Sequence, residues 1–355
     1  MKLILDNMVE EGWLVSQVHP TLDLTIYNYS QKTQYESRWN KHTLMCRGLV
    51  LNSKGEIVAR PFPKFFNYEE VAEQVPTRES YEIFEKMDGS LGIFFWYADE
   101  KTETLQPVFA SRGSFTSEQA VKGWEMLQKL PYHDLAYGHT HMFEIIYPEN
   151  RIVVDYGAEE RLVLLGVIHT SGGTEIPHKN LEEHLGDSFE LVKAYHSENG
   201  WEHLKSLNEP NKEGFVIRFN SGFRMKIKFE EYVRLHRIIT QVSNIDIWER
   251  LMKDESLDEL LEKVPDEFFS WVRDWEKALK FGYVMKEMEA KKWFDKLQEE
   301  LVFAERKEQA IWIMGMVPKE FQSIMFSMLD GRDYSQAIWK MLRPEWSKPF
   351  ANSEN

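Results

Sequence analysis

Cysteine is nearly absent from this chain of 355 residues, since Cys46 is the only one. A single cysteine excludes an intramolecular disulfide framework and argues against a cysteine-rich zinc site. The longest apolar run covers residues 162–168, far short of the ~20 residues that cross a bilayer. No Gly-x-x-x-x-Gly-Lys-Ser/Thr loop occurs in the sequence, which excludes a Walker-type ATP site. These absences predict a soluble protein of a reducing, intracellular compartment.

Basic residues are scarce relative to acidic ones. The chain carries 43 lysine and arginine residues against 58 aspartate and glutamate residues, a formal net charge of −15. This balance argues against a simple polycationic nucleic-acid binder, but it is compatible with a local basic cleft. Hydrophobic residues form 43% and charged residues 28% of the chain, which is typical of a folded globular protein. The N-terminal apolar run breaks at Asp6, so we expect no secretory signal peptide.

Glycine becomes rare after residue 240. Residues 241–355 hold 3 of the 19 glycines but 7 of the 12 tryptophans. The preceding part has the pattern of short strands separated by turns, whereas the later part has helical spacing. We therefore expect two domains, residues 1–240 and residues 241–355.

Turn residues and apolar periodicity locate the expected elements. Turns at Gly55 and Gly222 predict two hairpins. The expected strands are residues 46–52, 56–60, 91–97, 161–169, 214–219 and 223–229, and a helix is expected at residues 117–130. In the second domain, helices are expected at residues 245–264, 266–301, 303–316 and 319–329, with breaks at Pro265 and Pro318.

The segment around Lys86 has the pattern of a chemically active turn. Lys86 ends a strand-like run and is followed by Asp88 and the turn residue Gly89. A lysine acts as a nucleophile when neighbouring cations or burial favour its neutral form. Taken alone, however, the segment is more simply interpreted as a hairpin turn with a surface lysine.

Two further segments place charges in strand-like surroundings. Lys226 and Lys228 are separated by one apolar residue, so both project from the same face of a strand. Adjacent ammonium groups repel each other unless an anion lies between them, which fits a phosphate clamp. A solvated edge strand is an equally weighted alternative. Glu144 lies within an apolar run, where a buried carboxylate needs a hydrogen-bond donor or a cation.

In chain order, these segments resemble the motifs of the covalent nucleotidyltransferase superfamily, which includes ATP-dependent ligases and mRNA capping enzymes. The matching motifs are Lys-x-Asp-Gly at 86–89, Phe-Glu at 143–144, Glu-Gly-Phe-Val at 213–216 and Lys-x-Lys at 226–228. Finer similarities to the phage T4 RNA ligase 1 family occur at residues 46–48, 60–67, 112–114, 117–120 and 148–153. The resemblance extends over residues 20–240.

The resemblance implies an α+β fold, in which a nucleotidyltransferase (adenylyltransferase) domain with antiparallel sheets is followed by an all-α C-terminal domain. It also implies an ATP-dependent RNA ligase that forms a lysyl-AMP intermediate and then an adenylylated RNA end. Its cofactors would be ATP and a divalent metal, Mg²⁺ or Mn²⁺. Its partner would be RNA with 5′-phosphate and 3′-hydroxyl ends, single-stranded or in broken loops, as in RNA repair. We expect a monomer with no membrane partner.

The resemblance also implies roles for the residues of the reaction centre. Lys86 would be the nucleophile, and Lys226 and Lys228 would hold the α-phosphate. Glu144 would bind the ribose hydroxyl groups, and Glu213 would orient a hydrated divalent metal.

Other matching residues would bind the nucleotide around this centre. Asp88 would assist the metal or, with equal weight, only shape the turn. Family members often have lysine where Arg112 stands, which preserves the charge but changes its geometry. The further residues expected to bind ATP are Tyr27, Arg47, Lys64, Gly89 and Arg112, of which Arg47, Lys64 and Arg112 would contact the β- and γ-phosphates. Phe66 and Tyr232 match functional positions whose physical role the sequence does not assign.

Alternative functions on the same fold are a DNA ligase, a capping guanylyltransferase and a catalytically silent RNA-end-binding protein. DNA ligases and capping enzymes usually continue into a strand-rich OB domain, whereas the tryptophan-rich tail here has helical spacing. A silent binder would be expected to have lost some of the lysines and glutamates that this chain retains. Composition does not exclude GTP in place of ATP.

Overall fold

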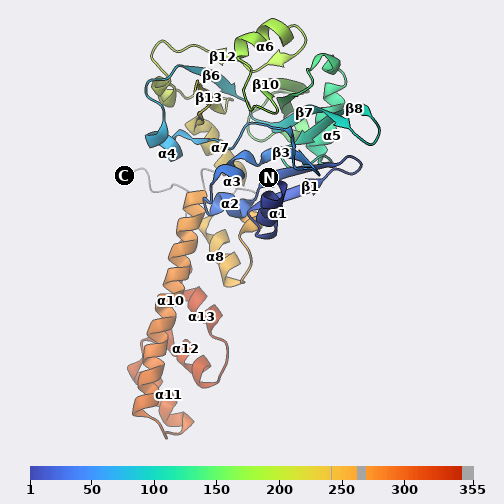
Figure 1. The fold of residues 1–355 in the computed structure, drawn as a ribbon. Helices are drawn as coiled ribbons and strands as arrows, with labels where there is room; N and C mark the ends of the chain where they lie inside the picture. The colour runs from blue at the N-terminus through green and yellow to red at the C-terminus, as the bar shows by residue number, and fades with distance from the viewer. Residues whose placement is uncertain (241, 262–268, 346–355) are drawn as a thin grey trace. The chain divides into compact units, whose positions relative to one another are not determined.

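The computed structural model describes residues 1–240, 242–261 and 269–345, without the side chains of residues 236–240 and 270. The chain divides into two compact units, Met1–Ile239 and Thr240–Asn355. The sheets of the described residues all lie in the first unit, and the second unit is helical (Figure 1).

A four-stranded antiparallel sheet forms the N-terminal part of the first unit, in the order β1-β2-β3-β4. Its strands are β1 (Leu14–Val18), β2 (Leu24–Tyr29), β3 (Arg47–Asn52) and β4 (Ile57–Ala59). The helices that accompany it in the chain are α1 (Lys2–Glu10), α2 (Gln31–Tyr35) and α3 (Lys41–Met45). Gly55 takes a φ of +79° at the turn between β3 and β4, so the first predicted hairpin is confirmed.

The central sheet has five strands in the order β11-β10-β9-β7-β8. They are β7 (Ser90–Asp99), β8 (Thr104–Ser111), β9 (His139–Ile146), β10 (Arg161–His169) and β11 (Glu190–Leu191). Helices α5 (Glu118–Leu127) and α6 (His178–Leu185) pack against this sheet (Figure 1). The strand expected at residues 161–169 is confirmed, and the helix expected at 117–130 is present as the shorter α5, capped by the side chain of Ser117.

The third sheet also has five strands, in the order β12-β6-β13-β14-β5. They are β5 (Phe66–Asn67), β6 (Tyr81–Lys86), β12 (Ala194–Tyr195), β13 (Gly214–Phe219) and β14 (Arg224–Lys228). Helices α4 (Tyr68–Val71) and α7 (Glu230–Thr240) flank it in the chain. The predicted hairpin of β13 and β14 is confirmed, with Gly222 at a φ of +86°. Short 3-10 helices also occur in this unit at Ala72–Gln74, Tyr132–Asp134, Pro148–Asn150 and Glu202–Ser206.

Apolar side chains join the central and third sheets. Phe84 and Met87, at the end of β6, share a buried cluster with Ile146, Val163 and Val192 from the neighbourhood of the central sheet. The C-terminal end of β6 is therefore fixed against β9 and β10, which positions the turn that follows Lys86.

The second unit consists of helices within the described residues. They are α8 (Asn244–Met252), α9 (Asp258–Leu261), α10 (Phe269–Glu300), α11 (Arg306–Met316), α12 (Lys319–Leu329) and α13 (Ser335–Met341). Its core contains Leu297 of α10, Ile313 of α11, Phe321 of α12 and Ile338 of α13.

Two expectations for the helices of this unit are wrong, and one helix was not expected. The helix expected at residues 245–264 ends at Met252, close to Asp254, which takes a left-handed φ of 55°. The helix expected from residue 303 begins at Arg306, after the capping residue Glu305. Helix α13 follows the segments for which helices are expected and has no counterpart among them. The expected break at Pro265 lies outside the described residues.

The expected α+β class is confirmed, with one refinement of the sheets. Strands β10 and β11 pair in parallel, as do β14 and β5, so the two five-stranded sheets are mixed rather than wholly antiparallel. None of the helices that the structure describes combines the length and apolar character needed to cross a membrane.

Candidate active site

A cavity of about 520 Å³ lies between the central and third sheets, within the ~300–1,000 Å³ range of small-molecule sites. Of the residues that the sequence predicts for the site, five line this cavity. They are Arg47, Lys86, Gly89, Arg112 and Glu144. They come from different strands and loops of the first unit, so the fold brings distant segments together here.

Cross-strand register places the predicted lysines on one face of the third sheet. Gly214 of β13 lies opposite both Lys86 of β6 and Lys228 of β14, and Lys226 lies two residues before Lys228. Because side chains alternate across a strand, the three lysines share a face. The intervening residues, such as Ile227, belong to the buried core of the opposite face.

Glu213 joins two of these lysines. One carboxylate oxygen lies 2.7 Å from Nζ of Lys86, and the other lies 3.2 Å from Nζ of Lys228. The side chain of Glu213 is only 3% exposed. Burial of a carboxylate is costly without opposite charge, so the lysine pair explains how Glu213 is tolerated next to the cavity.

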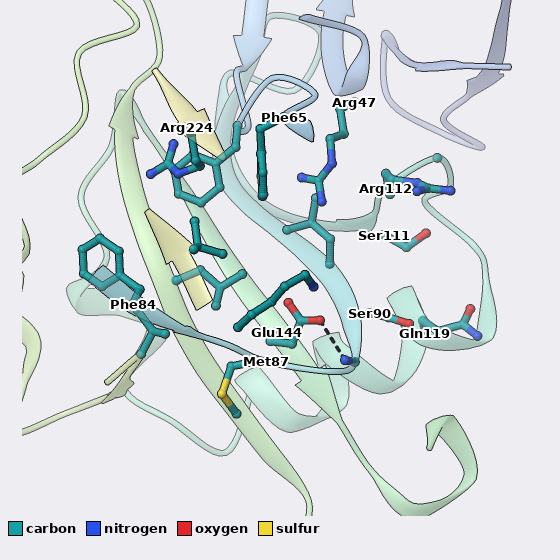
Figure 2. Close-up of a pocket in the computed structure, with 18 of the residues that line it drawn as sticks. Arg47, Phe65, Phe84, Met87, Ser90, Ser111, Arg112, Gln119, Glu144 and Arg224 are labelled. Atoms are coloured by element: carbon teal, nitrogen blue, oxygen red, sulfur yellow. Dashed lines mark hydrogen bonds between the residues drawn. The ribbon is translucent and has the colours of Figure 1, made fainter. Parts of the chain in front are cut away.

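Glu144 lies on β9 and faces the turn after Lys86. Its Oε1 accepts a hydrogen bond of 2.9 Å from the backbone N–H of Gly89, drawn as a dashed line in Figure 2. Burial raises the pKa of Glu144 to about 7, although the nearby charge of Lys86 opposes the shift. A Cβ atom at Gly89 would lie 2.7 Å from the carbonyl oxygen of Ile145. Glycine is therefore required where this turn approaches β9.

Asp88 anchors the same turn from inside the protein. Its Oδ2 accepts hydrogen bonds from the backbone N–H groups of Val153 and Val154, at 2.9 and 2.8 Å. Its Oδ1 accepts a 2.7 Å hydrogen bond from the hydroxyl of Tyr232. Both oxygens thus have protein donors, which favours the turn-shaping interpretation of Asp88 over the metal role. The same contact gives Tyr232 a physical role, that of holding the turn.

Lys64 and Phe66 lie outside the cavity lining but close to it. Lys64 is 8% exposed, and its ammonium nitrogen lies 5.4 Å from the centroid of the Phe66 ring. The next residue, Phe65, lines the cavity. The structure therefore brings both residues to the border of the site.

Tyr27 is not brought to the cavity. Its hydroxyl donates a 2.6 Å hydrogen bond to Asp6 and accepts one of 3.1 Å from Lys2, both on α1. Tyr29, two residues further along β2, accepts a 3.4 Å hydrogen bond from Nη1 of Arg112. Tyr29, rather than Tyr27, therefore contacts a residue that lines the cavity.

The cavity is lined by both polar and apolar side chains. In Figure 2, Ser111, Arg112 and Gln119 lie on one side, whereas Phe84 and Met87 lie on the other, together with Arg224. Such a lining suits a ligand with a flat apolar part and an anionic part, since aromatic and apolar side chains accept the first and arginine accepts the second.

Arg224 is a cavity residue that the sequence reasoning missed. It begins β14, on the same face as Lys226 and Lys228, and forms a buried ion pair of 2.8 Å with Glu175. The alternation that marks Lys226 and Lys228 continues back to Arg224, so the signal was present in the sequence.

The acidic residues of the site suit a divalent cation held by few protein ligands. No cluster of three or more histidine, cysteine, aspartate or glutamate side chains with the geometry for a metal ion occurs among the described residues. Glu213 and Glu144 supply carboxylate oxygens beside the cavity. Those of Glu213 contact side-chain ammonium groups, which can turn to a bound phosphate, whereas Asp88 is held by backbone N–H groups. Mg²⁺ commonly binds one or two carboxylates together with water and phosphate oxygens. The residues present therefore fit such an ion.

Comparison with known proteins places the chain among RNA ligases. A family model described as RNA ligase, of the T4 RNA ligase 1 type, matches residues 45–233, more than half of the chain. The chain therefore belongs to this RNA ligase family, and the predicted resemblance is confirmed.

Proteins with similar sequences are also named as RNA ligases. The RNA ligase of Rhodothermus phage RM378 is 25% identical over 323 residues, with 69% of this chain and 70% of that protein covered. A protein of Autographa californica nuclear polyhedrosis virus, whose name combines polynucleotide kinase and RNA ligase, is 26% identical and covers 68% of this chain. The chain spans only 38% of that viral protein. A protein of Thermovibrio ammonificans named as an RNA ligase is 32% identical, with 56% of this chain and 54% of that protein covered.

Solved structures of an RNA ligase from Naegleria gruberi are similar to part of the chain. The structure with AMP and Mn has a TM-score of 0.40 at 14% identity, and it covers 48% of this chain and 56% of that one. The structure with PPi has the same TM-score at 15% identity, and it covers 49% and 57%.

Proposed function

We propose that this chain is an ATP-dependent RNA ligase that joins 5′-phosphate and 3′-hydroxyl ends through a lysyl-AMP intermediate. The observation that carries the proposal is the shared ion pair at the cavity. Lys86 lines the cavity, and Glu213 holds it next to Lys228. This arrangement keeps a nucleophilic amine and a second cation close enough to act on one phosphate group.

In the first step, the ammonium group of Lys86 loses one proton, and its neutral Nζ attacks the α-phosphorus of ATP. The new N–P bond forms as the bond from phosphorus to the bridging oxygen of pyrophosphate breaks, and the amine releases its proton to solvent. Lys226 and Lys228 would stabilise the charge on the α-phosphate, and Arg47 and Arg112 would receive the departing β- and γ-phosphates. Phosphoryl transfer needs mainly positioning and electrostatic stabilisation, which these side chains supply.

Carboxylates of the site would bind the remaining parts of the nucleotide and the metal. Glu144 would accept hydrogen bonds from ribose hydroxyl groups, because its carboxyl group lines the cavity. Glu213, with water molecules, would hold Mg²⁺ or Mn²⁺. When bound, this cation supplies positive charge beside the α-phosphate.

The later steps transfer AMP and seal the strand. An oxygen of the RNA 5′-phosphate attacks the α-phosphorus, the N–P bond breaks, and the Lys86 amine regains a proton. The RNA 3′-hydroxyl then attacks the 5′-phosphorus, loses its proton, and AMP leaves as the phosphodiester forms. The expected substrate is RNA with single-stranded or broken-loop ends.

Covalent labelling tests the proposal. The full chain is incubated with ATP labelled at the α-phosphate and Mg²⁺ or Mn²⁺, and the protein is separated under denaturing conditions. We expect label on the wild type and on Lys179→Ala, a control at an 82% exposed lysine, but none on Lys86→Ala. Wild-type protein without label would contradict the proposal and favour the silent end-binding protein.

A joining assay tests the nucleic-acid class. The enzyme is given single-stranded RNA with a 5′-phosphate and a 3′-hydroxyl, or DNA of the same sequence. We expect circular or joined RNA and little joined DNA. Equal joining of the two would contradict the assignment to RNA.

A further inference from the structure

Lys64 lies in an aromatic cage formed by Tyr29, Trp39 and Phe66. Its ammonium nitrogen is 5.5, 5.5 and 5.4 Å from the three ring centroids, within the ~6 Å reach of cation–π attraction. Only 8% of Lys64 is exposed. Cation–π attraction is stronger where water is excluded, so the cage stabilises the charged ammonium in one place.

Trp39 connects the other two rings of the cage. Its ring lies 5.2 Å from the ring of Tyr29 and 5.3 Å from that of Phe66, and both pairs are T-shaped. Edge-to-face packing is a favoured arrangement of aromatic rings. Loss of the indole would therefore remove one wall of the cage and loosen the two others.

The chain around Trp39 is built to hold the indole in place. The backbone N–H of Trp39 donates to the carbonyl oxygen of Ser37 at 2.9 Å. The hydroxyl of Thr43 donates to the carbonyl oxygen of Arg38 at 3.2 Å, and the side chain of Asn40 caps α3. These contacts fix the backbone on both sides of Trp39, so the ring is presented with little freedom.

The cage adjoins the side of the cavity on which Arg112 lies. Lys64 and Arg112 each lie 5.5 Å from the ring centroid of Tyr29, and Arg112 lines the cavity. Tyr29 therefore lies between a caged ammonium and a guanidinium that faces the site (Figure 2 shows Arg112). A ligand group bound here would meet two cations held by one aromatic cluster.

We propose that Trp39 is a positioning residue that, through the cage, holds Lys64 ready to bind the pyrophosphate part of ATP. The inference rests on the proposed function. A lysine side chain loses considerable rotamer freedom when it is ordered. The cage imposes that order before the ligand arrives, so less of the binding free energy is lost when the phosphates bind.

A role of Lys64 in binding pyrophosphate predicts which reaction steps depend on Trp39. Lysyl-AMP formation releases pyrophosphate, and its reverse consumes pyrophosphate: a pyrophosphate oxygen attacks the α-phosphorus, the N–P bond breaks and ATP forms again. Sealing of an RNA that already carries AMP on its 5′ end needs no pyrophosphate. The cage should therefore affect the first reaction in both directions and leave the sealing step unchanged.

The test compares Trp39→Leu with wild type in three assays on the full chain. They measure the KM for ATP in lysyl-AMP formation, the pyrophosphate concentration that half-maximally reverses it, and sealing of pre-adenylylated RNA without ATP. We expect both concentrations to rise about three- to thirtyfold in Trp39→Leu, in line with the strength of cation–π contacts. Sealing should stay at the wild-type rate. Trp39→Phe, which keeps an aromatic ring in the cage, should bring both concentrations most of the way back to the wild-type values.

Controls separate positioning from folding. Trp124→Leu makes the same change at a tryptophan of another aromatic cluster in this unit, so it should leave both concentrations unchanged. An unaltered dependence on ATP and pyrophosphate in Trp39→Leu, or an equal loss in the sealing assay, would overturn the inference. If wild type forms no lysyl-AMP, the proposed function itself has failed.

Discussion

At the scale of single residues, the site depends on a carboxylate shared between two lysines. Glu213 is almost fully buried, and its two oxygens contact Lys86 and Lys228 separately. Each lysine offsets part of the desolvation cost of the carboxylate, and the carboxylate reduces the repulsion between the lysines. A phosphate group that enters the cavity brings negative charge of its own, so it can replace part of what Glu213 supplies to these lysines.

The buried carboxyl group of Glu144 predicts a pH-dependent stability. Burial raises the pKa of Glu144 from 4.5 to about 7 in the folded protein. Between pH 4.5 and pH 7, therefore, the carboxyl group keeps its proton in the folded chain but loses it in the unfolded chain. The cost to folding therefore grows as pH rises from 4.5 to 7 and stays constant above it. We expect Glu144→Gln, which retains an acceptor for Gly89, to melt at a higher temperature than wild type at pH 8.

Thermal melting without nucleotide at pH 4.5 and pH 8 checks this prediction. The advantage of Glu144→Gln should shrink toward zero at pH 4.5, because the wild-type carboxyl group is then largely protonated when folded. A difference that is independent of pH would show that the amide acts through packing alone.

The sequence motifs predicted five of the residues that line the cavity, but they could not give the hydrogen-bond partners of the site residues. Lys86 and Glu144 line the cavity as the motifs predicted. By contrast, a short motif does not show where a side chain finds its hydrogen bonds. Asp88 bonds to Tyr232, 144 residues away, and Tyr27 bonds to α1. Both contacts depend on how distant segments fold together, which a short motif does not report.

At the scale of elements, the register of three strands builds the site. Strands β6, β13 and β14 place Lys86, Gly214 and Lys228 in one row across the sheet. Side-chain alternation in the sequence predicted that Lys226 and Lys228 share a face. The order of the strands, and therefore the neighbours of this pair, arises from pairings between segments more than a hundred residues apart.

The row of Lys86, Gly214 and Lys228 across the three strands requires a glycine at position 214. Its φ is +146°, and a Cβ atom there would lie 2.0 Å from the carbonyl oxygen of Ile227. The atoms that this Cβ would meet belong to the backbone of β14, which cannot move aside as a flexible side chain can. We therefore expect Gly214→Ala to lower the free energy of unfolding by about 3 kcal/mol or more. The lysine pair should also separate, with a large loss of lysyl-AMP formation.

Denaturant unfolding measures this cost, and Gly222→Ala in the same hairpin is the matched control. Gly222 has a φ of +86°, but a Cβ atom added there would have no other atom of the described residues within 4 Å. Only the conformational cost of about 1–2 kcal/mol is therefore expected. Similar losses in the two variants would mean that close approach at Gly214 is unimportant.

The helical elements show where sequence patterns reach their limit. The helix expected at 319–329 is confirmed as α12, since Pro318 fixes its start. Apolar spacing alone did not show the end of α8 at Met252, because helical periodicity continues past the turn. Turn geometry at Asp254 depends on local backbone conformation, which periodicity does not report.

At the scale of the whole molecule, the acidic chain contrasts with its cationic cavity. The net charge is −15, yet Arg47, Lys86, Arg112 and Arg224 all line one cavity. A local field of this kind attracts phosphate although the protein as a whole is negative. Acidic surroundings weaken the hold on long nucleic acid, so RNA binding should be modest and should fall as salt rises.

The division into two units predicts how the nucleotide reaction responds to truncation. All the residues proposed to act on ATP precede Ile239, the last residue of the first unit. A fragment of residues 1–240 should therefore form lysyl-AMP at a rate comparable to that of the full chain, as measured with α-labelled ATP. Circular dichroism and thermal melting establish whether the fragment is folded. A folded fragment that takes no label would show that the helical unit completes the nucleotide site, whereas a labelled fragment that fails only in RNA joining would assign the helical unit to the RNA steps.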